Sequence, residues 1–153
     1  MSWVNKMVKN IKKLSSEDFR EIYSKVPRLC VEVLIKNSDG VLLTKRKITP
    51  WNGYWHLPGG GVLFGETLEE SIKRVAKEEL DVEIKIIKFV KIIDWANNKI
   101  AFGHSISLVY LVKIISGEIK LDFQTYLKNS SLLICKSCLI TLLSSPLSTS
   151  SFG

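Results

Sequence analysis

Residues 59–82, GGGVLFGETLEESIKRVAKEELDV, carry the strongest structural signal in the chain. They open with three consecutive glycines, which let a backbone turn tightly and approach a ligand closely. Thr67 with Glu70 three residues later forms a capping box, so we predict a helix over residues 67–80. A glycine run before a helix is a weak signal alone, because such a run is often only a loop.

One face of the predicted helix combines apolar residues with a carboxylate. At about 100° per residue, one side collects Leu68, Ile72, Val75, Ala76 and Leu80. Glu79 falls near the middle of that stripe. An unpaired buried carboxylate is costly, so we expect Glu79 to be paired, protonated or bound to a cation. Mg²⁺ held by carboxylate and carbonyl oxygens is the better account, whereas Glu70, Lys73 and Lys77 fit a solvated face.

The bulk composition is that of one packed, soluble domain of 153 residues, 46% of them hydrophobic. No apolar run reaches the roughly 20 residues that a membrane-spanning helix needs. Lysines dispersed through the N-terminal residues do not fit a secretory signal, so we expect a cytoplasmic protein. The net charge of +7 favours an anionic partner, which could be nucleic acid, a lipid surface or a phosphorylated small molecule. Cys135 and Cys138 lack the two further ligands that zinc requires.

Hydrophobic periodicity and turn signals predict strands around the central helix. Segments 29–37 and 41–46 flank a hairpin turn at Asn37-Ser38-Asp39-Gly40. Ahead of them we expect a helical stripe over residues 3–14 and a short helix capped by Ser15 or Ser16 and ended by Pro27. Further strands are expected at residues 54–57, 82–95, 100–114 and 119–123.

These elements predict an α/β (α+β) domain built on a mixed sheet. We place the domain at residues 1–124, with the N-terminal helices in residues 1–26. Residues 125–153 form an atypical Ser- and Leu-rich tail, a candidate for disorder, to which we assign no function.

Residues 60–82 resemble the Nudix box, G-x5-E-x7-R-E-U-x-E-E-x-G-U, in which U is aliphatic. The matching positions are Gly60, Glu66, Arg74, Val75, Ala76, Glu78, Glu79, Asp81 and Val82. Val75 replaces the first Glu of the R-E pair, and Asp81 replaces the last Gly. The resemblance implies a Nudix fold, in which helices sandwich a mixed sheet and the loop-helix motif binds a diphosphate with Mg²⁺ or Mn²⁺.

Upstream residues are similar to the GDP-mannose mannosyl hydrolase branch, over roughly residues 16–120. The likeness rests on Ser16-Glu17-Asp18-Phe19, Pro27, Glu32, Lys45-Arg46 and Gly53-Tyr54-Trp55. It implies that Glu32 contacts the nucleotide base and that Arg46 and Arg74 contact the diphosphate. It also implies that the Gly59 carbonyl and Glu79 bind the metal, with Glu78 as a further candidate ligand. The branch has an arginine where this chain has Gly61, so one diphosphate contact is missing.

The catalytic base is not evident from the sequence. The branch uses a histidine on a late loop, but this chain has no histidine after His104 and no acidic residue after Asp122. Asp94, His104 and Glu118 remain as candidates, or the base has been lost. Trp51 is a candidate for stacking on the nucleobase.

We therefore expect a Mg²⁺-dependent hydrolase of a nucleoside diphosphate linked to another moiety, with a nucleotide sugar such as GDP-mannose as the first candidate. One alternative is a pyrophosphohydrolase of the ADP-ribose or nucleoside triphosphate type. Another is a catalytically impaired nucleotide-binding module, which Val75 and the missing histidine favour. A nucleic-acid-binding function rests on charge alone. We expect neither nucleic acid nor membrane as a partner, and a homodimer is compatible with the sequence.

Overall fold

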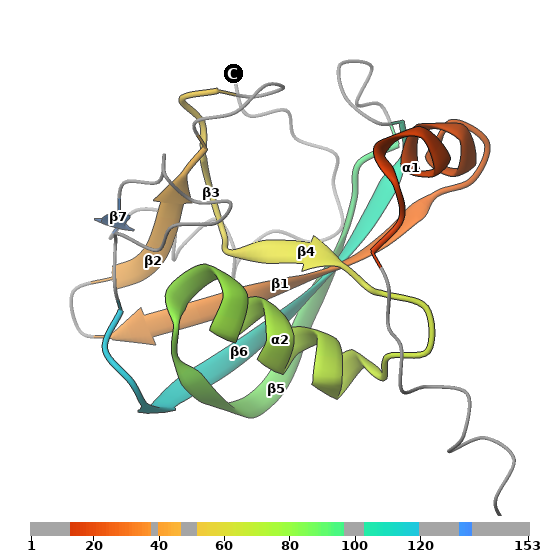
Figure 1. Ribbon diagram of the computed structural model, residues 1–153. Coiled ribbons are helices and arrows are strands. Elements are labelled where there is room, and N and C mark those ends of the chain that lie inside the picture. Colours follow the sequence, from red (N-terminus) through yellow and green to blue (C-terminus); the bar gives the residue numbers. More distant parts are fainter. Residues whose placement is uncertain (1–12, 38–39, 47–51, 97–102, 120–131, 136–153) are drawn as a thin grey trace, which may run out of the picture.

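The computed structural model describes residues 13–37, 40–46, 52–96, 103–119 and 132–135. These residues form two helices and seven strands (Figure 1). In chain order they are α1 (Ser16–Tyr23), β1 (Arg28–Asn37), β2 (Gly40–Lys45), β3 (Trp55–His56), β4 (Gly59–Gly61), α2 (Leu68–Leu80), β5 (Glu83–Asp94), β6 (Ser105–Ser116) and β7 (Leu132–Cys135). The predicted mixed α/β architecture is confirmed.

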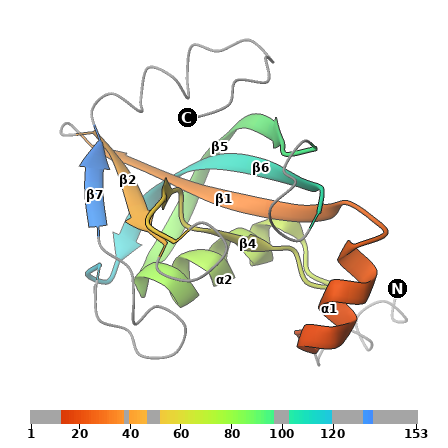
Figure 2. The same cartoon turned by 90° about the horizontal axis from the view of Figure 1, so that it is seen from above.

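Strand β1 organises the sheet, whose order is β3-β2-β1-β6-β5. On one edge β1 runs parallel to β6, from Arg28 opposite Ser105 onward. On its other edge, the first half of β1 pairs with β4 and its end forms a hairpin with β2. Helix α2 lies across one face of β1, β6 and β5, while α1 sits at the end where β1 begins (Figures 1 and 2).

Helix α2 confirms the prediction made for residues 67–80. Thr67 is its N-cap, and both hydrogen bonds of the capping box with Glu70 are present. Its predicted apolar stripe is buried against β1, β5 and β6, in a core that includes Ile72, Val75, Ala76, Leu80, Val31, Val33, Val82, Ile84 and Val112. The shorter α1 begins after Ser15, whose hydroxyl accepts from the Asp18 amide, and ends at Tyr23.

The glycine run differs from the tight turn that we expected, because Gly59–Gly61 form strand β4. The absence of side chains is still required, for a packing reason. A Cβ at position 59 would overlap the Glu32 carboxylate, and a Cβ at position 60 would lie 3.1 Å from Cγ2 of Val75. The glycines therefore let β4 lie close to the Glu32 side chain on one side and to α2 on the other.

The hairpin and the two long strands after α2 are confirmed, although β5 is one residue shorter at each end than predicted and β6 begins and ends later. In the segment that we treated as a tail, β7 pairs antiparallel with β2, with Val41 opposite Cys135 (Figure 2). These four residues therefore belong to the sheet. Residues 3–12 of the predicted N-terminal helix, Trp51, Cys138, residues 97–99 of the polar turn and residues 120–123 lie outside the described residues, whereas residues 13 and 14 are described and are not helical.

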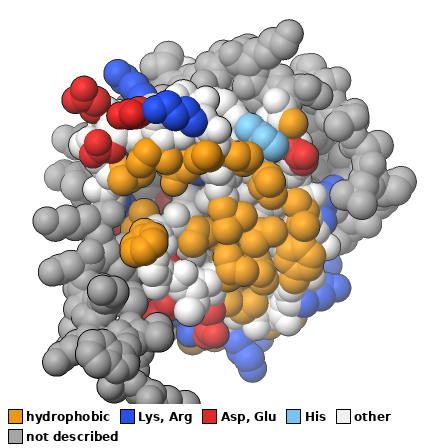
Figure 3. Space-filling view, turned by 90° about the vertical axis from the view of Figure 1, so that its right-hand side faces the viewer, with side chains coloured by type: hydrophobic (Ala, Val, Ile, Leu, Met, Phe, Trp, Pro, Cys, Tyr) orange, Lys and Arg blue, Asp and Glu red, His pale blue; other side chains and the backbone are white. Residues whose placement is uncertain are grey.

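The surface beside α1 is mainly apolar rather than basic. Hydrophobic side chains gather on the face shown in Figure 3, with lysines and arginines at its margins. Among the large hydrophobics that stay exposed are Leu29, Ile87, Phe89 and Ile92. No helix in the described part of the chain is long and apolar enough to cross a membrane.

Candidate metal and diphosphate site

Two carboxylates from different elements converge beside β4. Glu79, in the last turn of α2, accepts a hydrogen bond from the backbone N–H of Gly59. Its Oε2 atom is buried and has no hydrogen-bond partner among the described residues. Glu32, on β1, lies directly against Gly59. The two acidic side chains therefore share one small region, although they are 47 positions apart in the chain.

Both of these carboxyl groups hold their protons unusually strongly. Burial raises the pKa of Glu79 to about 7, and the nearby Glu78 carboxylate adds to the rise. Burial also raises the pKa of Glu32 to about 8, with a further contribution from repulsion by Glu79. A cation between them would favour the ionised form of both groups.

Glu32 is oriented by a hydroxyl that the sequence did not point to. Ser107 Oγ on β6 donates to Glu32 Oε1 at 3.0 Å and accepts from the indole Nε1 of Trp95 at 3.2 Å. Ser107 is buried, and Trp95 follows directly after β5. Strand alternation can indicate which face of the sheet Ser107 lies on, but not which side chains it contacts. No sequence motif therefore identifies the hydrogen bonds from Trp95 to Ser107 and from Ser107 to Glu32.

Arg74 is bound on all sides by protein groups. Its Nε and Nη2 atoms donate to the two oxygens of Glu66, at 2.6 and 2.9 Å, and Nη2 also donates to the Gly61 carbonyl at 2.9 Å. Nη1 donates to Glu78 at 3.3 Å. Burial raises the pKa of Glu66, but hydrogen bonds from Arg74, Ser71 and the Leu63 amide outweigh it and lower that pKa to about 2. The Glu66–Arg74 ion pair, through the bond from Arg74 to Gly61, is therefore a brace that links β4 to α2.

Glu78 faces away from the pair formed by Glu32 and Glu79. Its Oε2 atom contacts Nζ of Lys13 at 3.1 Å as well as Nη1 of Arg74, and 43% of its side chain is exposed. Adjacent helical residues differ by about 100° in direction, so Glu78 lies on the outer side of α2 while Glu79 points inward.

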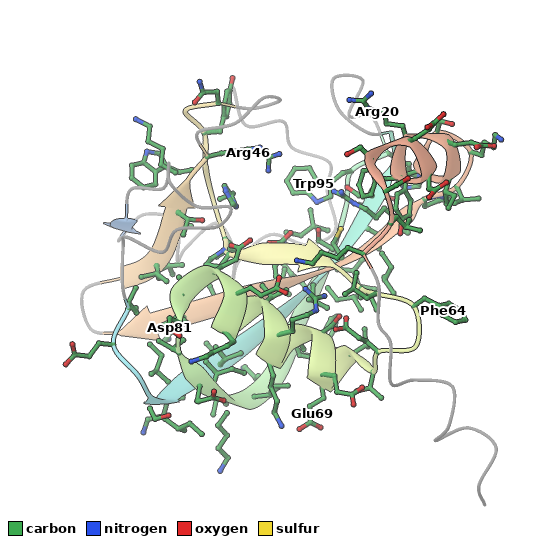
Figure 4. All side chains as sticks on the ribbon, in the orientation of Figure 1. Arg20, Arg46, Phe64, Glu69, Asp81 and Trp95 are labelled. Atoms are coloured by element: carbon green, nitrogen blue, oxygen red, sulfur yellow. The ribbon has the colours of Figure 1, made fainter. Side chains whose placement is uncertain are left out.

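Two arginines share the surroundings of the carboxylate pair. Arg46 follows β2 and extends toward the middle of the molecule, in the direction of Trp95 (Figure 4). Its backbone bonds to the Tyr54 carbonyl and the Gly53 amide close the connection between β2 and β3. Burial and the neighbouring charge of Arg28 lower the pKa of Arg46, while the Glu79 carboxylate raises it. Arg28 was not among the site residues predicted from the sequence.

The three candidate bases lie toward the ends of β5 and β6. His104 Nε2 is 2.8 Å from Asp94 Oδ1, and both side chains are partly exposed. His104 is three residues before Ser107, about 10 Å along the strand. Glu118 follows the turn at Gly117, where a Cβ would lie 2.8 Å from the Asp81 carbonyl oxygen. The geometry thus joins His104 to Asp94, and it places Glu118 at the other end of β6, beside the end of α2.

The comparison with known protein families agrees with this geometry. The model of the NUDIX domain matches residues 26–130, which is more than half of the chain. The chain belongs to the Nudix family. Its Nudix box includes α2, the Glu66–Arg74 brace and Glu79.

Similar proteins include both pyrophosphatases and a glycan biosynthesis protein. An ADP-ribose pyrophosphatase of Methanocaldococcus jannaschii is 36% identical over 94 residues, 61% of this chain and 55% of that protein. A low-salt glycan biosynthesis protein of Haloferax volcanii is 37% identical over 82 residues, 54% of this chain and 53% of that protein. This chain thus spans about half the length of these curated relatives.

The structural comparison gives the same fold. The crystal structure of a MutT Nudix hydrolase from Burkholderia pseudomallei superposes with a TM-score of 0.64 at 26% identity, and the match covers 79% of this chain and all of the other.

The two residues that depart from the Nudix box, Val75 and Asp81, both fit the structure around them. Val75 is 2% exposed and packs in the core beneath Gly60. Asp81 is the C-cap of α2 and adopts a left-handed conformation with φ 56°. Glycine is the usual residue there, but a short polar side chain tolerates that conformation. Asp81 also pairs with Lys77 at 2.7 Å.

The donor set fits a hard divalent cation. In the described part of the chain, no three His, Cys, Asp or Glu side chains form a metal-binding group. Two carboxylates and a glycine carbonyl are nevertheless the kind of partial shell that Mg²⁺ accepts, because it keeps several waters and takes further ligands from substrate phosphates. The unpartnered Oε2 of Glu79 is the atom that gains most from such an ion.

Proposed function

We propose that this Nudix domain is a Mg²⁺-dependent hydrolase that acts on a nucleoside diphosphate joined to a sugar. The observation that carries the proposal is the buried, unpartnered oxygen of Glu79 beside the glycine strand β4 and a second carboxylate. ADP-ribose and GDP-mannose share the substrate chemistry. The first is named for the M. jannaschii relative, and the second is suggested by the upstream resemblance to the mannosyl hydrolase branch.

In this proposal Glu79 and the Gly59 carbonyl hold Mg²⁺, which neutralises diphosphate charge and makes the leaving group better when it is bound. We place Glu32 on the metal side of the site rather than against a nucleobase, because its carboxylate lies against Gly59 and is repelled by Glu79. Glu78 remains a candidate that would have to release Lys13 and Arg74 first.

The two arginines implied by the family resemblance take different roles in this proposal. Arg46 lies close enough to Glu79 for their charges to interact, and it would bind diphosphate through its planar fork. Arg74 already donates to Glu66, Gly61 and Glu78. Its role is therefore to hold β4 at the right distance from α2, and so to position Glu79 against Gly59.

A second candidate function is nucleotide binding with slow turnover. It is favoured by Val75, a buried aliphatic residue at a box position that carries a carboxylate in many Nudix enzymes. It is also favoured by the pairing of His104 with Asp94. A missing base commonly reduces a rate by about 10² to 10⁴.

A substrate panel separates these functions. The chain is incubated with ADP-ribose, GDP-mannose and nucleoside triphosphates, with Mg²⁺ or Mn²⁺, in oxygen-18 water. Label in the phosphate product indicates attack on phosphorus, and label in the sugar indicates attack on carbon. Binding without product, in a preparation whose mass is that of the full chain, favours the binding module. Failure to bind any of these compounds would contradict both functions.

A further inference from the structure

The geometry points to Arg28 as a second diphosphate-binding residue, which works with Arg46 and occupies the space beside Gly61. The inference rests on the proposed function, since it assigns a substrate contact within the same site. Nothing in the sequence motif indicates it, because Arg28 lies on β1, outside the Nudix box.

The first line of evidence is position. Arg28 and Glu32 point to the same face of β1, because side chains alternate along a strand. Between them the Arg28 guanidinium bonds to the Cys30 thiol, so the side chain runs along β1 toward Glu32. Its Cδ atom lies 3.8 Å from the place where Gly61 would carry a Cβ. Gly61 is the position at which the family resemblance left a diphosphate contact missing.

The second line of evidence is an unused donor. The Nε–H group of Arg28 is buried and has no hydrogen-bond partner among the described residues. The guanidinium is held in place by the Phe19 ring of α1, with its central carbon 5.4 Å from the ring centroid. A buried donor without an acceptor is costly, and a phosphate oxygen would supply the acceptor.

The third line of evidence is charge. The charge of Arg28 lowers the pKa of Arg46, so the two guanidinium groups lie near each other. Arg28 also lies near the Glu32 carboxylate, and Arg46 lies near that of Glu79. A divalent cation on the two carboxylates would neutralise them and leave two guanidinium charges. Those two charges match the two negative charges of a diphosphate ester. Arg74 is not available for this role, since Glu66, Gly61 and Glu78 already bind it.

The test compares binding of ADP and AMP, with Mg²⁺ present, in the full chain and in its variants by titration calorimetry. Arg28→Met keeps an unbranched apolar stem and removes the guanidinium with its charge. We expect it to weaken ADP binding about tenfold or more and AMP binding much less, because Arg46 alone can hold one phosphate. Mn²⁺ binding without nucleotide should not weaken, because the charge that is lost repels the cation. Arg20→Met, on the exposed side of α1 (Figure 4), is the matched control and should bind ADP as the parent does.

A second variant protects the test against a purely structural effect. Gly61 has room for a side chain, since the nearest atom to a Cβ there, apart from its chain neighbours, is Cδ of Arg28 at 3.8 Å. Gly61→Arg in the Arg28→Met background should therefore restore much of the ADP affinity. Failure to restore it in a folded protein would contradict the assignment, and so would an equal loss for ADP and AMP in Arg28→Met.

The outcome for the parent chain separates this inference from the proposed function. If the parent and Arg28→Met bind ADP equally while Arg46→Met binds it weakly, Arg28 is not a diphosphate contact and the proposed function stands. If the parent binds neither ADP nor ADP-ribose, the proposed function itself is contradicted.

Discussion

Arg74 and Glu66 form a two-pronged ion pair, with Nε–Oε1 and Nη2–Oε2 distances of 2.6 and 2.9 Å. The pair is enclosed, since only 3% of the Glu66 side chain and 20% of the Arg74 side chain are exposed. Nη2 of Arg74 also donates to the Gly61 carbonyl. The pair therefore ties α2 to the end of β4, and through β4 it fixes Gly59 opposite Glu79.

Glu66→Gln is expected to destabilise the fold by about 3 kcal/mol, because removal of one partner leaves a largely buried guanidinium without its counter-ion. Chemical denaturation would measure the change. Glu69→Gln, on the exposed side of the same helix, removes only the surface pair with Lys73 and should change stability by less than about 1 kcal/mol. Equal changes in stability for the two substitutions would show that the Glu66–Arg74 pair stabilises the fold no more than a surface ion pair does.

The pH dependence of stability should reveal the carboxylate pair. Glu32 and Glu79 have pKa values of about 8 and about 7, above the ordinary value of 4.5. Between pH 4.5 and 8 the folded chain thus binds more protons than the unfolded chain, so the metal-free protein should lose stability as the pH rises. Thermal melts across this range would show it, and Glu32→Gln should flatten the decline. An identical pH profile for this variant and the parent would contradict the assignment.

Glu79→Gln should remove metal binding while the fold is kept. The substitution deletes a buried charge and keeps the shape of the side chain, so the metal-free melting temperature should not fall. Mn²⁺ titration followed by electron paramagnetic resonance would measure binding directly. Glu69→Gln is again the control, since Glu69 is exposed and bound to Lys73. Equal Mn²⁺ affinity in Glu79→Gln and the parent would rule out Glu79 as a ligand.

Arg46→Lys is expected to weaken binding of a nucleotide sugar about tenfold, because a single ammonium cannot reproduce the fork that binds two phosphate oxygens. Calorimetry with ADP-ribose and Mg²⁺ would measure the dissociation constant. Lys45→Arg, one residue earlier, keeps the total charge and should have little effect, since Lys45 lies over the Trp55 ring. An unchanged dissociation constant in Arg46→Lys would exclude Arg46 from the diphosphate site.

Local signals predicted the helix well, and they singled out Glu79 within it. The capping box at Thr67 fixes where α2 begins, and the 3.6-residue period fixes which side chains face the core. Glu79 stood out because a carboxylate in an apolar stripe needs a partner. The hairpin was equally predictable, because its turn signal at residues 37–40 is local.

Residues whose role depends on pairing between distant segments could not be predicted in this way. Arg28, Trp95 and Ser107 meet the site only because β1 runs parallel to β6 with Arg28 opposite Ser105. The sequence of neither strand alone specifies that register. The glycine strand was mistaken for a turn for the same reason, since the need for small residues comes from Glu32 and Val75, both distant in sequence.

Substitution of Val75 tests whether the missing glutamate at this position of the Nudix box makes hydrolysis slow. It lies one helical turn before Glu79, beneath Gly60, and it is almost completely buried. Val75→Glu would bring a carboxylate to the edge of β4, near the cation that we assign to Glu79. We expect hydrolysis of ADP-ribose to increase, by up to about 10² to 10⁴, with oxygen-18 from water appearing in the phosphate product.

The same substitution should cost stability, about 2 to 4 kcal/mol, because a charged group replaces a core methyl pair. Val75→Gln is the matched control, since it has the same shape and a similar packing cost but cannot accept the proton of water. It should therefore show the lower melting temperature without the gain in rate. If Val75→Glu folds and hydrolyses ADP-ribose no faster than Val75→Gln, a carboxylate at this position does not act as the base. If instead the parent already turns over rapidly, alanine substitutions at His104, Asp94 and Glu118 in turn would identify which of them takes the proton.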